Sequence, residues 1–480
     1  MGSVGSTGDA IEILDRVFGA GMPGADPHVR AAASRREFVR SQTGIAEASP
    51  GATGRRLSAS EAFQTFGLSL LDKAIGEGQA SLVPGRYEPA DTLLRRREAL
   101  GLSRKDLARF AAVPVADVMR AETPGLVSPI RTLERLAAYL ALDESILGFR
   151  QGAAADVDLG QRLKELSGTD ERTRLSPRVV AALSEAAWVI AKQMKLWERT
   201  GEAGPRLHQL FDPNVDYSYP TYEVGYRLAK TTRAQLNIGD GEPIPSVRRL
   251  IEDRLSIPLV QTALGTRIAG ATISNGEYRG IVANIEGANE NVWIRRMTLA
   301  HELGHLLHDP PARLNKLAVD RYDELEGSRR VLRDGPEIRA NAFAIAFLAP
   351  PAEIQSIVGI YNDVWAAIRE ITGRFGISVT AARRHVENVC HIVVRPQPRD
   401  MTFHPSDDWR ADENHTIDYY PIKTTPKSRQ GRFTWVVLRA LDLRIISLDS
   451  AASFLNADTE KLDRNRQELL NLTSPGDLLL

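Results

Sequence analysis

The sequence predicts a mainly helical α+β protein built from several domains, and three observations lead to this class. Its 480 residues exceed one ordinary core, because a domain usually holds about 100 to 200 residues. The composition, with 43% apolar and 25% charged residues, is that of a globular protein. Segments of helical and strand periodicity alternate in one central block, which follows a stretch of predicted helices and precedes strand-like runs. We therefore expect roughly three cores.

Charge and cysteine content restrict the function classes. Lysine plus arginine equals aspartate plus glutamate at 61 each, so attraction to nucleic acid or membrane must come from local patches. The single cysteine, Cys390, excludes an intramolecular disulfide and a cysteine-only metal site, and it fits a reducing compartment. The chain has no apolar run of about 18 residues, the length that spans a bilayer. We expect a cytoplasmic protein without a membrane segment.

Changes of composition and periodicity divide the chain into five regions. A poorly defined N-terminal region, of which residues 1 to about 60 are expected to be mobile or loosely docked, is followed by a module of short helices and a helical linker. A block of mixed helix and strand and a strand-rich C-terminal region of unknown role complete the chain. In this order the regions are residues 1–88, 89–150, 151–216, 217–395 and 396–480.

Cap and turn residues predict the short helices of the second region, which lie within residues 92–142. Ser103 and Asp106 form a capping pattern that opens the second helix. The triplet Ala112-Val113-Pro114 makes a short turn, and Val115 opens the third helix. The spacing predicts four or five helices in all.

The neighbouring regions hold fewer signals. In the first region, IEILDRVF at 11–18 predicts a short helix. The linker begins with a patch of small residues, QGAAADVD, from Gln151. A long buried helix then runs from Leu175 to Trp197, with Ser176-Pro177 as cap and first-turn proline.

The fourth region alternates helix with strand. Its sequence predicts a helix at 222–238, a helix leading into a strand at 248–260, and a hairpin at 271–285 with Asn275-Gly276 at its turn. Helices return further along this region. In the fifth region, the strand-like runs RFTWVVLRAL, from Arg432, and LRIISL precede a polar helical tail.

The stretch TLAHELGHLLHDP, from Thr298, gathers three of the nine histidines. On a helix His301 and His305 project from one face one turn apart, the spacing with which two imidazoles bind one zinc ion. Glu302 cannot point at the metal but reaches the water beside it, where a carboxylate acts as general base. His308 shares the face and is expected to support a ligand. The alternative is a solvated polar face on an ordinary helix.

A catalytic zinc site takes a third protein ligand and keeps one position open. Glu337 is the best candidate, because Gly335-Pro336 opens the helix EIRANAFAIAFLAP there. A helix so apolar is buried and needs a reason to carry Glu337 and Asn341 on one face. Metal binding by Glu337, supported by the Asn341 amide, supplies that reason; the alternative is a glutamate favoured by the helix dipole. The expected cofactor is Zn²⁺.

Four segments within residues 222–394 resemble, in order, the ImmA/IrrE family of metallo-endopeptidases: IAGATISNGEYRGIVANI, RRMTLAHELGHLLHD, EIRANAFAIAFLAPPAEI and GRFGISVTAARRHVENV. The resemblance implies a zincin-like domain with a small sheet, in which a hairpin borders the substrate cleft. It also implies that His301, His305 and Glu337 bind zinc and that Glu302 is catalytic. Members of the family are implied to cleave helix-turn-helix repressors in stress, mobile-element or phage-defence regulation.

The short helices at 92–142 resemble an XRE-type helix-turn-helix module, whose third helix would enter a major groove. Residues 92–150 hold ten Lys/Arg and seven Asp/Glu, a surplus of three that is modest for a phosphate-binding surface. The alternative is a module that pairs with protein, either as a homodimer or by capturing another helix-turn-helix protein. The residues assigned to DNA contact are Arg104, Lys105, Asp117 and Arg120.

The leading hypothesis is a zinc-dependent endopeptidase whose substrate is a helix-turn-helix regulator encoded nearby. The alternative is a DNA-binding transcriptional regulator whose protease-like domain senses a ligand or a partner. Retention of Glu302 together with the metal ligands favours the enzyme, because a sensor has no need of the base.

Overall fold

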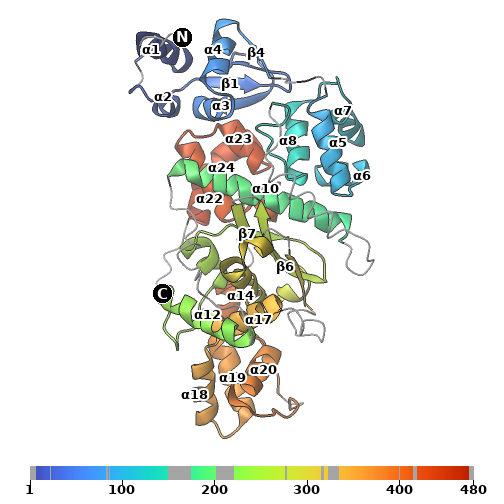
Figure 1. The fold of residues 1–480 in the computed structure, drawn as a ribbon, viewed down its shortest axis with the longest axis vertical. Coiled ribbons are helices and arrows are strands. Elements are labelled where there is room, and N and C mark those ends of the chain that lie inside the picture. Colours follow the sequence, from blue (N-terminus) through green and yellow to red (C-terminus); the bar gives the residue numbers. More distant parts are fainter. Residues whose placement is uncertain are drawn as a thin grey trace. The chain divides into compact units, whose positions relative to one another are not determined.

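A computed structural model describes the chain as two compact units (Figure 1). Unit 1 comprises Met1–Ala203 and Tyr419–Ser474, and unit 2 comprises Gly204–Asp418 and Pro475–Leu480. Both combine helices with a small sheet, which confirms the coarse α+β, mainly helical class. The five-region division stays a prediction, and the patch from Gln151 lies outside the described residues. These are 7–21, 23–82, 85, 87–149, 175–201, 221–275, 278–314, 318–322, 335–398, 401–414 and 419–474.

The described residues of 7–82 form a layer of sheet and helices in unit 1, which corrects the expectation that residues 1 to about 60 dock loosely. Its sheet is antiparallel, in the order β3-β1-β2-β4, and Phe38, Ile45 and Leu71 are fully buried in its core. The strands have only two to four residues, too few to show a period in the sequence. The bounds are α1 Thr7–Phe18, α2 Pro27–Ala33, β1 Glu37–Arg40, β2 Gly44–Glu47, β3 Arg55–Ser58, α3 Ala59–Phe66, α4 Leu68–Gly76 and β4 Ala80–Ser81.

Four short helices follow within the described residues 87–149, as the cap and turn residues predict. The predicted capping box is confirmed: Ser103 Oγ accepts a hydrogen bond from the Asp106 backbone at 3.1 Å, and the Asp106 carboxylate faces the Ser103 backbone in return. At the turn between the second and third helices, Ala112 has a φ of 51°, a conformation that glycine adopts more readily. The helices are α5 Ala90–Ala99, α6 Arg104–Phe110, α7 Val115–Ala121 and α8 Ile130–Tyr139.

The described C-terminal segment 419–474 is helical, so the prediction of a strand-rich C-terminal region is wrong. The run from Arg432 forms a helix that is buried on most sides, and its less covered residues, Trp435, Arg439 and Asp442, recur at three- and four-residue steps, the period of a helical face. Its β-branched and aromatic residues, typical of strands, hid that period. The buried apolar residues of this helix are Phe433, Val436, Val437, Leu438, Ala440 and Leu441, and Arg432 and Thr434 are buried as well. The elements are η4 Lys427–Arg429, α22 Arg432–Asp442, α23 Leu448–Phe454 and α24 Thr459–Thr473, and the long predicted helix is α10 Pro177–Thr200, which packs against α22.

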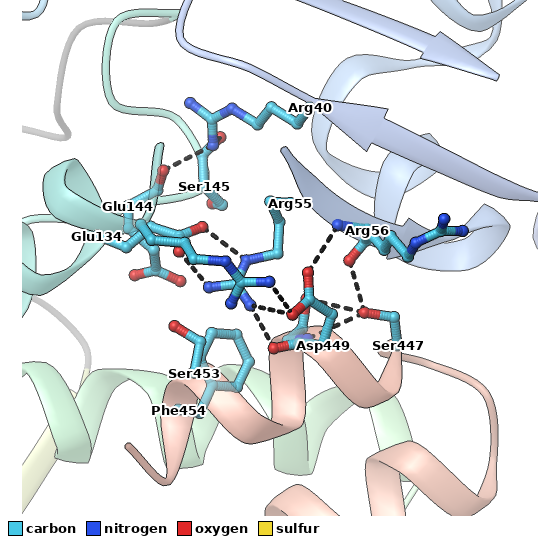
Figure 2. A network of polar contacts seen from close by, with 12 residues as sticks. Arg40, Arg55, Arg56, Glu134, Glu144, Ser145, Ser447, Asp449, Ser453 and Phe454 are labelled. Atoms are coloured by element: carbon cyan, nitrogen blue, oxygen red, sulfur yellow. Dashed lines mark hydrogen bonds and ion pairs between the residues drawn. The ribbon is translucent and has the colours of Figure 1, made fainter. Parts of the chain in front are cut away.

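A buried polar network joins the sheet of unit 1 to α8 and α23 (Figure 2). Arg55 of β3 donates from Nε to Glu134 of α8 at 2.8 Å, and it also binds the backbone carbonyl of Asp449 in α23. The Asp449 carboxylate accepts from the Arg56 backbone at 2.9 Å and pairs with Arg131 at 2.5 Å. These buried charges are tolerated because each carboxylate has several donors. The network attaches the C-terminal helices to the N-terminal sheet within this unit.

Unit 2 contains a mixed sheet in the order β5-β7-β6-β8. The predicted hairpin is confirmed: β6 and β7 are antiparallel, with Asn275 opposite Tyr278, while Gly276 of its turn lies outside the described residues. β5 runs parallel to β7 and follows a helical segment, as predicted. The bounds are α13 Val247–Arg249, η1 Leu250–Arg254, β5 Leu259–Thr262, β6 Ile268–Asn275, β7 Tyr278–Asn284, η2 Gly287–Glu290 and β8 Ala318–Arg321.

The helices of unit 2 bury one face of this sheet. α14 contacts β6 and β7 directly, and α17 contacts both α14 and α12 (Figure 1). Phe343 and Phe347 of α17 are buried and stack with ring centroids 5.2 Å apart. The bounds are α12 Thr221–Gln235, α14 Val292–His308, α15 Pro311–Leu314, α17 Gly335–Leu348, α18 Pro351–Ile360, α19 Val364–Phe375, α20 Val379–Cys390 and α21 Asp407–Asp412.

The apolar character of α17 and α18 reflects their place in this core. Within the described ranges, no helix taken singly has the length and apolarity to cross a membrane. The pair α17 and α18, bent by 56°, meets both criteria when counted together. Phe343, Phe347, Ile354 and Ile357 of this pair are buried in the core of unit 2.

A buried ion pair fastens the segment 401–414 to the core of unit 2. Arg296 of α14 lies 2.8 Å from Glu413, and both side chains are fully buried. Glu413 also accepts hydrogen bonds from the backbone nitrogens of Val247, at 2.6 Å, and Arg248, at 2.8 Å. The carboxylate is therefore satisfied from two elements that are far apart in the sequence.

The buried imidazole of His385 in α20 is expected to make stability depend on pH. Its Nε2 donates to the Ala349 carbonyl at 2.9 Å, and its Nδ1 accepts from Tyr226 Oη at 3.3 Å. Burial lowers the pKa of His385 to about 4, so below about pH 6.5 only the unfolded chain takes up this proton. We expect up to about 3 kcal/mol of stability, complete above that pH, to be lost as the pH falls to about 4.

Hydrogen exchange in α20 peptides, measured between pH 7 and 4.5 after correction for the intrinsic rate, tests this expectation. The His385→Gln variant is the control and should show a smaller loss of protection over the same range. Equal losses in the two proteins would contradict the assignment to His385.

Candidate metal centre

Helix α14 presents two histidines and a glutamate to one place in unit 2. The helix begins after Asn291, whose side chain accepts a hydrogen bond from the Trp293 backbone at 2.9 Å, an ordinary N-cap. His301, Glu302 and His305 are at most 1% exposed, so these polar groups need partners inside the protein. The predicted apolar stripe is also buried, at Leu299, Leu303, Leu306 and Leu307.

The structure brings the three predicted ligands together. The Nε2 atoms of His301 and His305 lie 3.0 Å apart, and Oε2 of Glu337 lies 3.4 Å from the first and 3.5 Å from the second. A zinc ion bound tetrahedrally at about 2.0–2.1 Å sets its ligand atoms about 3.3–3.4 Å apart. The three protein atoms therefore have the spacing of one face of such a tetrahedron.

A fourth residue, Asp320 of β8, belongs to the same group as its second carboxylate and was missed by sequence reasoning. Its Oδ2 lies 3.7 Å from His301 Nε2, and the four ligand-type atoms all lie within 4.8 Å of one another. This buried group could hold a metal ion. Nothing in the sequence marks Asp320, because its four-residue strand reaches the group through pairing with β6.

Glu337 is oriented by neighbours that sequence reasoning also missed. Arg313 donates to Oε1 of Glu337 at 2.5 Å, which leaves Oε2 for the histidines. Gly304 lets α14 approach α17, since a Cβ there would lie 2.7 Å from the Phe343 ring. Burial acts to raise the pKa of Glu337, but hydrogen bonding to the two histidines lowers it below its usual range. The carboxylate is therefore ionised, as metal binding requires.

Asp309 orients His305. Its carboxylate lies 2.9 Å from His305 Nδ1, so a neutral imidazole donates from Nδ1 and directs the Nε2 lone pair into the group. Arg313, at 2.9 Å, and Arg339 hold the same carboxylate. His305 is therefore held by Asp309, and Asp309 in turn is held by the two arginines.

The supporting role assigned to His308 falls to Asp309, which is a correction to the sequence prediction. His308 Nε2 lies 3.2 Å from Thr232 Oγ1, and its ring packs against Phe343. His308 comes only three residues after His305, but its Nε2 atom faces Thr232, and His308 is not a member of the group. Asn341 shares a face of α17 with Glu337 and lines a cavity of about 700 Å³ in unit 2.

Glu302 lies beside the group, against β6. Thr272 Oγ1 donates to its Oε2 at 2.8 Å, and Gly270 leaves space for Oε1, because a Cβ on Gly270 would lie 2.6 Å from that atom. Burial raises the pKa of Glu302 to about 7, although hydrogen bonding to Asp320 opposes the shift. A carboxyl of this pKa can take up and release a proton near neutral pH.

Metal binding by the group can be tested with one substitution in α17 and a matched control substitution in α14. Glu337→Gln replaces a carboxylate ligand with an amide and should weaken metal binding by more than about 100-fold, the upper range for losing a mere supporting contact. His308→Gln, on the same helix as the ligands but outside the group, should bind metal as the wild type does. Isothermal titration with Zn²⁺ measures both, and equal affinity in the two variants would contradict the assignment.

The residues assigned to DNA contact lie in unit 1. Arg104 of α6 is exposed, and its guanidinium lies 2.7 Å from the carboxylate of the buried Glu122. Lys105 and Arg120 are exposed, and Asp117 is half-buried on α7. Whether this module binds DNA or protein stays a prediction.

The candidate metal centre thus combines two imidazoles and two carboxylates, a group that could hold a metal ion, with a buried glutamate of near-neutral pKa beside them. In comparisons with known proteins, no family model matches the chain and no curated protein is significantly similar to it.

Proposed function

We propose that the protein is a zinc-dependent endopeptidase that cleaves a regulatory protein of the helix-turn-helix type. The observation that carries the proposal is the triangle formed by the ligand atoms of His301, His305 and Glu337, with the Glu302 carboxylate beside it. Two imidazole nitrogens favour zinc over magnesium or calcium, which prefer oxygen ligands.

The side chains around the centre support hydrolysis. Zinc bound there would polarise a substrate carbonyl and lower the pKa of a water molecule to about 7. Glu302 Oε1 would accept a proton from the attacking water and deliver it to the leaving amine nitrogen as the C–N bond breaks. Thr272 holds the other oxygen of Glu302, so the proton moves at Oε1.

A protein substrate is supported by the sequence resemblance to the ImmA/IrrE family over residues 222–394, which implies cleavage of helix-turn-helix repressors.

The proposal is tested by co-expressing the chain with helix-turn-helix regulators encoded beside its gene. We expect a discrete fragment of one regulator, absent when zinc is chelated and restored when zinc is returned. Cleavage that is indifferent to chelation, or purified protein without stoichiometric zinc, would overturn the proposal in favour of a sensor domain.

The Gly270→Ala substitution is expected to impair cleavage without removing the metal ligands. The new Cβ would lie 2.6 Å from Glu302 Oε1 and 3.0 Å from the backbone oxygen of Val282, so strand and carboxylate must move apart. A displacement of about 1 Å at a reacting group can lower the rate about 100-fold. We expect a loss of this order in the cleavage rate, with zinc content near that of the wild type.

The matched control is Gly359→Ala in α18, where a Cβ would meet nothing within 4 Å. This substitution should leave cleavage unchanged and slightly favour the helix. A Gly270→Ala enzyme as active as this control would show that Glu302 does not depend on the space at Gly270.

A further inference from the structure

A cavity of about 700 Å³ lies inside unit 2, among α12, α14, α17 and α20. Ligand sites in proteins commonly measure about 300–1,000 Å³. A space of this size exceeds one side chain and accommodates a bulky side chain together with flanking backbone.

The two helices that carry His301, His305 and Glu337 also line the cavity. Met297 lines the cavity four residues before His301, and Asn341 and Ile345 line it four and eight residues after Glu337. Residues four apart share a helix face and lie about 6 Å apart along the axis. An extended peptide advances about 3.3 Å per residue. A side chain one or two residues from a bond at the metal centre would therefore reach the cavity.

The wall formed by α14 and α17 is mainly apolar, with Asn341 as its polar residue. Ile294, Met297, Ile338 and Ile345 line it and are half-buried, unlike the fully covered core residues of the same helices. Apolar surface that the protein leaves partly covered, beside a row of polar groups, is suited to an apolar ligand.

Helix α20 supplies a polar rim. Thr380, Arg384, Glu387 and Asn388 line the cavity at positions that repeat with the helical period. Hydroxyl and amide groups can bond to the N–H and C=O groups of a peptide backbone. Arg384 and Glu387 have opposite charges, so the rim selects no net charge.

We propose that this cavity receives a bulky apolar side chain, such as leucine, methionine or phenylalanine, next to the peptide bond presented to the metal centre. The inference rests on the proposed peptidase function and names its substrate preference. The apolar wall covers the side chain, and the rim on α20 bonds to the backbone that carries it.

The test measures peptide binding without turnover, in the zinc-loaded full-length Glu302→Gln protein. The probes are two blocked hexapeptides, one of alanine only and one with a single central phenylalanine. We expect the phenylalanine peptide to bind about tenfold more tightly or better, because a phenylalanine side chain is buried. Asn388→Trp and Thr380→Trp place an indole at the exposed rim, and each should abolish the difference while zinc content is retained.

The matched control is Glu370→Trp, at an exposed position of α19 that does not line the cavity, and it should preserve the preference. Equal affinity for the two peptides, or a preference that survives both rim substitutions, would overturn the inference even where zinc-dependent cleavage is observed. If zinc is absent from the wild type, the peptidase proposal fails by itself. A phenylalanine preference lost on rim substitution would then still identify a site for apolar peptides.

Discussion

The Glu302→Gln variant is expected to retain zinc and to lose cleavage of its protein substrate by about 100- to 10,000-fold, the usual contribution of a general acid–base residue. Glutamine has nearly the shape of glutamate and can still bond to Thr272, which contacts Glu302 at 2.8 Å. It cannot, however, accept the proton of the attacking water. The measurement is the rate of fragment formation at saturating zinc, with metal content determined on the same samples.

A matched control for this variant is Glu290→Gln, at an exposed glutamate of η2 just before α14. It should cleave as the wild type does. If Glu302→Gln cleaves at the rate of this control, the base must be another group. If it loses zinc together with activity, Glu302 holds the metal centre together and its chemical role is unsupported.

The Glu413→Ala variant is expected to destabilise unit 2 by about 3 to 5 kcal/mol, the cost of removing one partner from a buried ion pair. Arg296 would remain fully buried beside an empty position, and the backbone nitrogens of Val247 and Arg248 would lose their acceptor. Denaturant unfolding followed by hydrogen exchange in α14 and α13 peptides measures the loss. Peptides of unit 1 report from the same sample whether the effect is confined to unit 2.

Asp407→Ala removes the exposed partner of the surface pair that Arg410 and Asp407 form at 2.8 Å in the same segment. Because surface ion pairs contribute little, this control should change stability by about 0.5 kcal/mol or less. Equal losses of unfolding free energy in the two variants would mean that the buried ion pair of Glu413 stabilises unit 2 no more than the surface pair does.

The C-terminal helices show where pattern reading fails. In α22 the β-branched and aromatic residues favour a strand when read one by one, but burial follows the helical period. The contact with α10 selects the helix, because tertiary packing outweighs a propensity difference of a few tenths of a kcal/mol per residue. The short strands of the N-terminal sheet were missed for another reason, because a strand of two to four residues is too short to show a period in the sequence.

The sequence by itself determined those interactions that join residues close together in the chain. His301 and His305 share a helix face four residues apart, and Ser103 caps the turn that contains Asp106. Such interactions join residues within one helical turn, so the separation of two residues in the sequence predicts their distance in the folded protein. Glu337 could also be predicted from the sequence, because a polar residue at the start of a buried apolar helix must have a partner.

The tertiary structure alone decided which distant groups complete the centre. Asp320 joins it by strand pairing, Arg313 turns one oxygen of Glu337 away, and Gly270 makes room for Glu302. Asp309 takes the supporting place that helical spacing had suggested for His308. No sequence period relates these residues, because the sheet register and the approach of α14 to α17 bring them together, and both are set by the packing of the whole core.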